Sequence, residues 1–373
     1  MKVLFLADNP TMATGYGKIV KNLGFQLNKK GIEVGYIGIQ YLGAPIDIDL
    51  GFKTILFPFD VFNSNRCIDR VIDYFKPDYL IHVRDNWAFF FEKYNLSEFK
   101  NKVKIVLYSP VNEYPVPIKF LQCVNQGHFQ LVTTKKAMEY FKKNGIDNVD
   151  YLYHGVDLDT YKRFSHVKKE DFGFTGEIVI GFIGENTERK DIPKLIYAVS
   201  ELSKKYDLNL YLHTNPEGKI VLEPFQILTY IHYYKISQIT IFPRIEGLWG
   251  FDDKKLAEVI NCFDIYCSPS KAEGFDIPCI EAQACGIPVI ASKIPAHEEI
   301  MGDNYVKVET DVEFTKWGGI RNPVKVKDLI EKLELLIEDE KLRKEYSEKG
   351  IENAKKYTWG ASAEKLIKIL EKI

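Results

Sequence analysis

The carboxylates of Glu273 and Glu281 are separated by seven residues in the segment PSKAEGFDIPCIEAQACGIPVIAS, which covers residues 269–292. We expect Glu273 in a loop after a strand, and Glu281 about one turn into the helix that follows. Carboxylates accept hydrogen bonds from hydroxyl groups but do not bind phosphate. The pair therefore predicts recognition of a sugar or a ribose. A solvated loop residue and an exposed helix residue are the plain alternative for two such glutamates.

The backbone between these two glutamates is suited to an anion. Pro278 stands near the first position of the expected helix, where the amide hydrogen that it lacks would have no helical partner, and Gly286 closes the helix. The N–H groups of Gly274, Phe275 and Asp276 and of the helix start could cradle a diphosphate. The segment thus predicts a diphosphate next to a hydroxyl-bearing group.

A basic pair follows another expected strand, which ends at Gly184. Arg189 and Lys190 lie in the segment ENTERKD, where this strand gives way to a helix. A guanidinium offers phosphate a fork of N–H donors and an ammonium acts as a point charge, so the pair could neutralise a departing diphosphate. An ordinary basic pair in a loop is the alternative.

The pattern P-S-x-x-E-G-F-x-x-P-x-x-E-A-x-A-x-G-x-P-V-I-A resembles the donor-site signature of the retaining GT-B glycosyltransferases of family 4, also called glycosyl transferases group 1. The whole chain fits this group, and its second half is the more typical. The resemblance implies that Glu273 approaches the donor sugar and that Glu281 holds the ribose hydroxyls. Many members carry Arg directly after the glycine of the phosphate site, where this chain has Glu185. Lys190 and Arg189 would then supply the catalytic cations.

The same resemblance implies two further donor contacts. In the family, a glycine followed six residues later by lysine marks the phosphate site, and Gly184 provides that glycine here. The strand similar to ITIFP ends against the nucleotide base in the family, which implies a donor contact near Pro243 and Arg244.

A glycine-containing loop, NPTMATGYGK, follows the first expected strand. Gly15 and Gly17 open a helix there, so backbone N–H groups could meet a ligand, and a simple turn is the alternative. In the family, a Gly-rich loop at this place closes over the diphosphate and approaches the acceptor. Gly15 and Gly17 are therefore expected to bind the donor, and Tyr16 is expected on the acceptor side.

Further acceptor-side residues are expected after two other strands of the first half. Asn112 and Glu113 lie in YSPVNEYPVP, near the place where some relatives carry an acidic residue or a histidine. Trp87 lies in HVRDNWAFFF and could stack on the face of a sugar. A rigid loop and a packed aromatic cluster, respectively, are the alternatives.

Alternating apolar strands and amphipathic helices predict the elements that position these residues. The alternation runs through the first half of the chain and restarts at EIVIGFIG, residues 177–184, which is typical of parallel sheets covered by helices. We expect an α/β protein of the GT-B class, with two Rossmann-like domains that face a central cleft. Residues 1–168 would form the acceptor domain and residues 169–355 the donor domain, and a helix at 356–373 would cross back to the first domain.

The composition excludes several classes of protein. The chain has 373 residues, with 50 Lys and Arg against 52 Asp and Glu, which argues against a nucleic-acid-coating protein. No stretch reaches the ~18 apolar residues of a membrane helix, so a cytoplasmic protein is expected, with peripheral membrane contact left open. The six cysteines lack a C-x-x-C pair, which favours free thiols. Neither a complete G-x-G-x-x-G pattern nor a P-loop is present.

These observations predict a retaining, metal-independent glycosyltransferase that moves a sugar from a nucleotide-diphosphate sugar to a hydroxyl of a glycan, lipid, protein or small molecule. No metal ion is expected at the site, and no cofactor is expected beyond the donor substrate. The alternatives are a sugar-nucleotide epimerase or a phosphorylase on the same scaffold, or a catalytically silent nucleotide-sugar-binding protein, because a fold does not determine a function.

Overall fold

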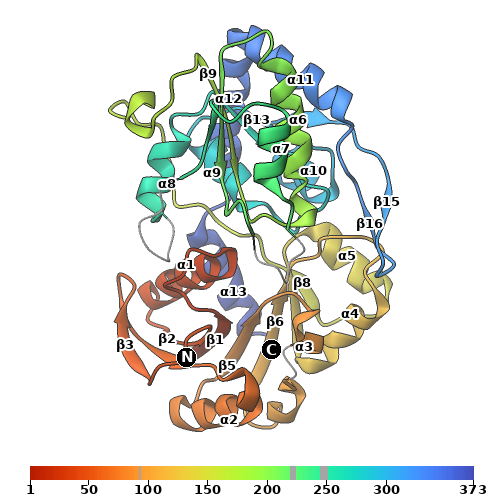
Figure 1. Ribbon diagram of the computed structural model, residues 1–373. Helices are drawn as coiled ribbons and strands as arrows, with labels where there is room; N and C mark the ends of the chain where they lie inside the picture. Colours follow the sequence, from red (N-terminus) through yellow and green to blue (C-terminus); the bar gives the residue numbers. More distant parts are fainter. Residues whose placement is uncertain (92–93, 219–223, 244–250) are drawn as a thin grey trace. The chain divides into compact units, whose positions relative to one another are not determined.

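The computed structural model describes residues 1–91, 94–218, 224–243 and 251–373 (Figure 1). The chain divides into two compact units: unit 1 consists of Met1–Gly155 and Trp359–Ile373, and unit 2 of Val156–Thr358. The division falls before the expected boundary at residues 168 and 169. The N–H of Val156 donates to the carbonyl of Tyr357 at 3.0 Å, which joins the two segments where the chain enters and leaves unit 2.

Unit 1 is built on a sheet whose eight strands, in the described part of the chain, are arranged in the order β3-β4-β2-β1-β5-β6-β7-β8. All neighbours are parallel except β3 and β4, which are antiparallel. The strands are β1 (Lys2–Asp8), β2 (Glu33–Ile39), β3 (Ile46–Asp49), β4 (Lys53–Pro58), β5 (Tyr79–Val83), β6 (Lys104–Ser109), β7 (Phe129–Val132) and β8 (Val149–Tyr151). The strand order reverses between β1 and β5, which is where ligands bind in open α/β sheets.

Helices cover both faces of this sheet, because β1 is apolar on both sides. They are α1 (Gly15–Lys29), α2 (Ser64–Phe75), α3 (Ala88–Phe91), α4 (Ile118–Gln122), α5 (Lys135–Lys143) and α13 (Trp359–Leu370). Leu4 and Leu6 of β1 share a buried cluster with Ile68 of α2. On the other face, Phe5 stacks on Tyr36, whose hydroxyl donates to the carbonyl of Val20 in α1.

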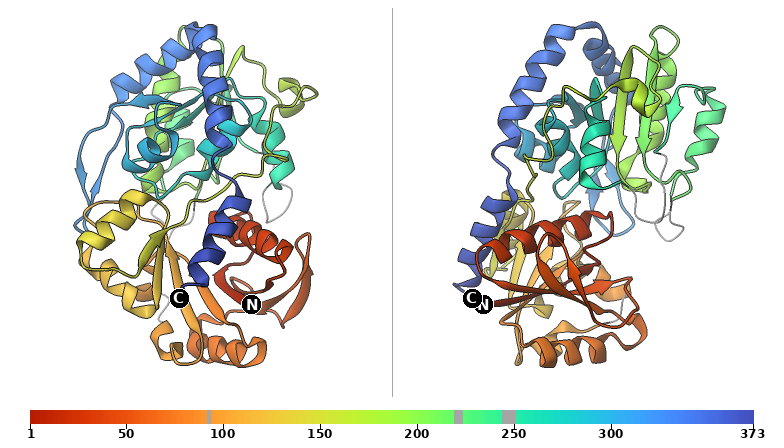
Figure 2. Two further views of the ribbon diagram at one scale, coloured as in Figure 1. Left: turned by 180° about the vertical axis from the view of Figure 1, so that it is seen from behind. Right: turned by 90° about the vertical axis from the view of Figure 1, so that its left-hand side faces the viewer.

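The last helix, α13, belongs to unit 1. It lies beside α1 (Figure 2), and Lys30 forms an ion pair with Glu364 at 2.9 Å. The hydroxyl of Ser362 donates to the carbonyl of Tyr153, and the hydroxyl of Tyr79 donates to that of Leu370. These contacts attach the end of the chain to α1, β5 and the segment after β8.

Unit 2 contains a second parallel sheet, with six strands in its described part and the order β11-β10-β9-β12-β13-β14. The strands are β9 (Ile178–Ile183), β10 (Leu208–His213), β11 (Thr240–Ile241), β12 (Ile265–Ser268), β13 (Val289–Ser292) and β14 (Val306–Val308). Here the strand order reverses between β9 and β12. The segments with site chemistry, ENTERKD and PSKAEGF, follow these two strands.

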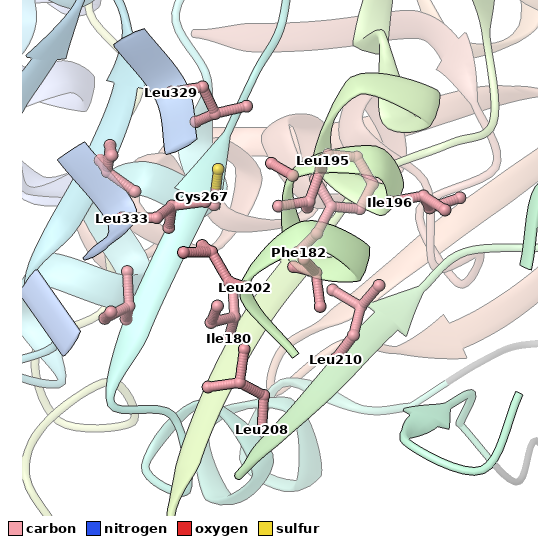
Figure 3. Close-up of a cluster of buried hydrophobic side chains, with 14 of the residues drawn as sticks. Ile180, Phe182, Leu195, Ile196, Leu202, Leu208, Leu210, Cys267, Leu329 and Leu333 are labelled. Atoms are coloured by element: carbon pink, nitrogen blue, oxygen red, sulfur yellow. The ribbon is translucent and has the colours of Figure 1, made fainter. Parts of the chain in front are cut away.

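The helices of unit 2 are α6 (Ile192–Leu202), α7 (Ile227–Tyr233), α8 (Asp253–Ile260), α9 (Ile277–Ala284), α10 (Pro295–Met301), α11 (Val326–Glu338) and α12 (Glu340–Ala354). Ile180 and Phe182 of β9 pack against Leu195 of α6 and Leu333 of α11 (Figure 3). Elsewhere in the unit α12 packs on α9, where the Asn353 amide donates to Gln283 at 2.8 Å. The charged segment of residues 325–354 thus consists mainly of two helices, α11 and α12.

The sequence did not predict β3 or the antiparallel pair β15 (Glu313–Phe314) and β16 (Ile320–Arg321). These strands are short and none of their residues is buried, so they lack the buried apolar run that identifies the other strands. The six cysteines are free thiols, and five of them are buried. Among the described residues, no helix is both long and apolar enough to cross a membrane.

Candidate functional site

The loops after β9 and β12 bring three of the predicted catalytic residues together. Arg189 and Lys190 end a short 3-10 turn, Glu188–Lys190, between β9 and α6. Glu273 lies in the loop between β12 and α9. The N–H of Lys271 donates to the carbonyl of Arg189 at 2.8 Å, so the two loops are joined through their backbones. The site therefore lies at the point where the strand order of unit 2 reverses.

Both cations contact the Glu273 carboxylate. The ammonium of Lys190 lies 2.7 Å from Oε1 of Glu273 and 3.2 Å from Oδ1 of Asp276. The guanidinium of Arg189 pairs with Oε2 of Glu273 and donates to the carbonyl of Ala272 at 2.7 Å. The side chains of Lys190 and Glu273 are 9% and 6% exposed, so these charges are largely shielded from solvent.

The local charges keep both members of the Lys190–Asp276 pair ionised. Burial by itself would lower the pKa of Lys190, but the carboxylates of Asp276 and Glu273 outweigh burial and raise the pKa above 10.5. Burial would likewise raise the pKa of Asp276, but the Lys190 ammonium and His297 hold it well below 3.8. A permanent positive charge is therefore fixed at the start of α6.

Gly184 leaves room for this lysine. A Cβ at residue 184 would lie 3.2 Å from Cε of Lys190 and 2.9 Å from the Phe182 ring. The glycine expected in the phosphate site is therefore required by packing around the lysine side chain. Pro243 lies just after β11, and its neighbour Arg244 lies outside the described residues.

The segment that begins α9 has the geometry expected from its proline and its glycine. Pro278 occupies the first turn, and Gly286 adopts a φ of +74° just after the helix. Asp276, at the N-cap, adopts a φ of +71°, which is uncommon for a residue with a side chain. The Phe275 ring is buried edge-on against Tyr357, with ring centres 5.7 Å apart. Any contact of Phe275 with a diphosphate would therefore come from its backbone.

Glu281 lies on α9 and is 2% exposed. It is close to Tyr161, whose hydroxyl donates to Asp253 at 2.8 Å. Burial, followed by the charges of Glu281 and Asp253, raises the pKa of Tyr161 well above its ordinary value. We did not predict Tyr161 from the sequence. The signal that could have identified it is its position four residues after the segment HGVD (residues 154–157), at the entry to unit 2.

A second polar cluster lies in unit 1, where the strand order reverses between β1 and β5. Arg84 forms an ion pair with Asp8 at 2.8 Å. Asp85 accepts a hydrogen bond from the Tyr16 hydroxyl at 2.6 Å and one from the Asn112 amide at 3.4 Å. Two acceptor-side candidates from distant segments thus meet at one carboxylate.

The other expected acceptor-side residues, Trp87 and Glu113, are half-buried in the loops that follow β5 and β6. At the start of α1, the N–H of Gly17 donates to the Thr14 hydroxyl at 3.0 Å and is thereby capped. A Cβ at Gly17 would approach the carbonyl of Met12 to 2.7 Å, whereas one at Gly15 would meet nothing within 4 Å. Packing within its own loop thus explains why residue 17 is a glycine. The backbone of Gly15 is more exposed than that of Gly17.

One group among the described residues has the composition of a metal site: Asp276, Cys279 and His297, whose potential ligand atoms lie within 4.8 Å of one another. All three are buried. The Lys190 ammonium, 3.2 Å from the other oxygen of Asp276, already neutralises this carboxylate and would repel a divalent cation. The geometry favours a hydrogen-bonded network over a metal centre.

Comparison with known proteins found similarity to glycosyltransferases. Residues 234–353 match the family described as Glycosyl transferases group 1. An uncharacterized glycosyltransferase of Methanocaldococcus jannaschii is 28% identical over 250 residues, which are 63% of this chain and 63% of that protein. A D-inositol 3-phosphate glycosyltransferase of Corynebacterium diphtheriae is 26% identical over 192 residues, 50% of this chain and 41% of that protein. The matched segments thus cover 41% and 63% of the length of these two relatives, which is less than two thirds in both cases.

Solved structures show the same fold over the full chain. Sucrose-phosphate synthase from Thermosynechococcus elongatus aligns with a TM-score of 0.79 and 15% identity, covering 100% of this chain and 98% of that one. Anabaena HepE in complex with UDP and glucose aligns with a TM-score of 0.76 and 16% identity, covering 100% of both chains. With its two α/β sheets the chain has the GT-B fold, and the segment of unit 2 that matches Glycosyl transferases group 1 is similar to that family.

Proposed function

We propose that the chain is a retaining, metal-independent glycosyltransferase that moves a sugar from a nucleotide-diphosphate sugar to an acceptor hydroxyl. The observation that carries this proposal is the convergence of Arg189, Lys190 and Glu273 at the reversal point of the unit 2 sheet. Cations and a carboxylate at one place suit a ligand that carries phosphate on one side and hydroxyls on the other.

The donor diphosphate would take the place of Glu273 as the partner of the two cations. In the ligand-free arrangement both cations contact this carboxylate. A diphosphate carries more negative charge than a single carboxylate, so it competes for Lys190 and Arg189. The released Glu273 can then accept hydrogen bonds from the sugar hydroxyls. Fixed positive charge next to the leaving diphosphate stabilises the transition state without reorganisation of solvent.

Glu281 would hold the ribose of the nucleotide. Its carboxylate is buried beside the Tyr161 hydroxyl, and a pair of ribose hydroxyls would donate hydrogen bonds to it. The complex of Anabaena HepE with UDP and glucose makes UDP-glucose the first donor to test on this chain. We propose that the acceptor proton goes to an oxygen of the donor phosphate, since the resemblance to the family implies retention and no protein base is assigned.

We propose that the acceptor is bound by unit 1. The cluster around Asp85 joins a carboxylate, a phenol and an amide, which together can accept and donate hydrogen bonds to hydroxyl groups. This chemistry suits a polyhydroxylated acceptor. Asn112 and Tyr16 would orient the hydroxyls and Trp87 would offer an aromatic face, while Glu113 follows on the same loop as Asn112.

The test measures release of nucleotide diphosphate from UDP-, GDP- and ADP-glucose, with and without added sugars as acceptors. Glu273→Gln should lower turnover by about 10²–10³-fold. Glu345→Gln is the matched control, because Glu345 is 53% exposed on α12 of the same unit. Nucleotide binding without any product would indicate a binding protein, and phosphate-dependent glycan cleavage would indicate a phosphorylase; either result contradicts the proposal.

A further inference from the structure

Asp276 joins four separate segments of unit 2 through one buried carboxylate, whose side chain is 1% exposed. Its Oδ2 accepts hydrogen bonds from the Ser268 hydroxyl at 2.6 Å, from Nε2 of His297 at 3.0 Å and from the Cys279 thiol at 3.2 Å. Its Oδ1 faces the Lys190 ammonium at 3.2 Å. These partners come from β12, α10, α9 and the turn before α6.

The ring of His297 lies between two hydrogen-bond acceptors. Nε2 faces the Asp276 carboxylate, and Nδ1 lies 2.8 Å from the carbonyl oxygen of Ser292. The Ser292 hydroxyl also lies near Nδ1, but it donates to the carbonyl of Ser270 and has no second proton for the ring. A neutral imidazole has one N–H group, so it would leave one nitrogen facing an acceptor without a proton. Both contacts are satisfied only by the doubly protonated imidazolium.

We propose that Asp276 and His297 form a buried ion pair that positions Lys190 for the donor diphosphate. This inference rests on the proposed function for the identity of the ligand. Glu273 changes partner when the donor binds, whereas both carboxylate oxygens of Asp276 are occupied by partners within unit 2, so Asp276 keeps its contacts. Asp276 therefore holds the Lys190 ammonium in place when Glu273 leaves, and His297 fixes the carboxylate from its other side.

The pair also accounts for the unusual backbone at residue 276. A left-handed conformation is unfavourable for aspartate and persists only where the surroundings fix it. The bonds to Ser268, Cys279 and His297 provide that constraint. The same backbone turn starts α9, so the ion pair orients the helix start and the lysine together. His297 adds one positive charge beneath the anion site, where it favours a diphosphate through space.

The protonation of His297 can be measured without a ligand. The full chain is labelled with ¹⁵N-histidine, and the ring nitrogens are recorded at pH 7.5. His297→Gln assigns the signal, and His232→Gln, at an exposed position on α7, is the matched control. We expect His297 to have both nitrogens protonated in the wild type. A neutral ring overturns the proposal, and so does a stoichiometric metal ion that co-purifies with the wild type and is lost in His297→Gln.

The positioning of Lys190 is tested by its reactivity and by binding. In Asp276→Asn, the ammonium has lost one of its two carboxylate partners, and acylation of Lys190 by acetic anhydride should become about tenfold faster. UDP affinity, measured by calorimetry, should fall about tenfold in Asp276→Asn and in His297→Gln but not in His232→Gln. An unchanged Lys190 labelling rate, or unchanged UDP affinity in both variants, overturns the proposal. A wild type that binds no UDP, GDP or ADP contradicts the proposed function, while the ring and labelling measurements still decide the ion pair.

Discussion

Replacing Lys190 by methionine should destabilise unit 2, because the ammonium lies between two buried carboxylates. At 2.7 Å from Glu273 and 3.2 Å from Asp276, an effective dielectric constant of about 20 gives attractions of about 6 and about 5 kcal/mol. The dehydration of the charges cancels much of this attraction, and the loss of one partner from a buried pair costs about 3–5 kcal/mol. Arg189 still faces Glu273 in the variant, so we expect a loss near the lower end, about 3 kcal/mol.

Urea denaturation of the full chain measures this loss, and hydrogen exchange of the amides of β9 and β12 assigns it to unit 2. Lys204→Met is the matched control: Lys204 pairs with Glu201 at 2.7 Å, but it is 66% exposed. Its replacement should change the free energy of unfolding by less than about 0.5 kcal/mol.

A second variant tests the cause of the loss. In Lys190→Met alone, the Glu273 carboxylate keeps only Arg189 as its positive partner. Combining Lys190→Met with Glu273→Gln removes this under-compensated carboxylate. The double variant should therefore be more stable than the sum of the two single losses predicts, by about 1–2 kcal/mol. A loss below about 1 kcal/mol in Lys190→Met, or strict additivity in the double variant, would refute the view that Lys190 neutralises buried carboxylates.

Three further predictions follow from single contacts. Gly17→Ala should destabilise unit 1 by about 1–3 kcal/mol in thermal melting, because a Cβ would lie 2.7 Å from a carbonyl oxygen, whereas Gly15→Ala should not, since its Cβ meets nothing within 4 Å. Glu281→Gln should raise the KM for UDP-glucose about tenfold and change kcat little, as expected for a group that binds the ribose and not the reacting atoms; an effect on kcat alone would contradict that role. The folded-state pKa of Asp276 is depressed, so its contribution to stability is present above its unfolded pKa and is lost as pH falls toward the folded value. The stability difference between the wild type and Asp276→Asn should accordingly narrow when melting is measured below about pH 4 instead of at pH 7.

The parallel sheets could be predicted from sequence because their strands are buried on both faces. EIVIGFIG and VLFLAD are nearly continuous apolar runs, and the structure contains β9 and β1 there. In β3, by contrast, the residues IDID alternate over only four positions, pair with β4 and remain largely exposed, so no buried apolar run identified the strand. The proximity of Lys190 and Glu273 could be predicted because Lys190 follows β9 and Glu273 follows β12, the two neighbouring strands between which the strand order reverses.

The environment of Asp276 could not be predicted in the same way. We interpreted this residue from the sequence as a source of a backbone N–H, whereas its side chain is the hub of a buried network. Local pattern cannot reveal such a hub, because its partners Lys190 and His297 are far from it in sequence. Only the packing of β12, α9 and α10 around the loop brings them together.

The two reversal points of the strand order hold different chemistry, and this difference explains how a chain with a net charge of -2 could bind a diphosphate. In unit 1, Arg84 is neutralised by Asp8, and the remaining groups at Asp85 are a phenol and an amide, so the cluster offers hydrogen bonds to hydroxyls and no excess of positive charge. In unit 2, the cations of the turn before α6 adjoin the helix start, and under the proposed function their carboxylate partner would leave them for a sugar. The two cations are thereby gathered at one point that is largely shielded from solvent. A localised site of this kind needs no basic surface. Where solvent is excluded, the effective dielectric constant is lower and each cation attracts the phosphate more strongly.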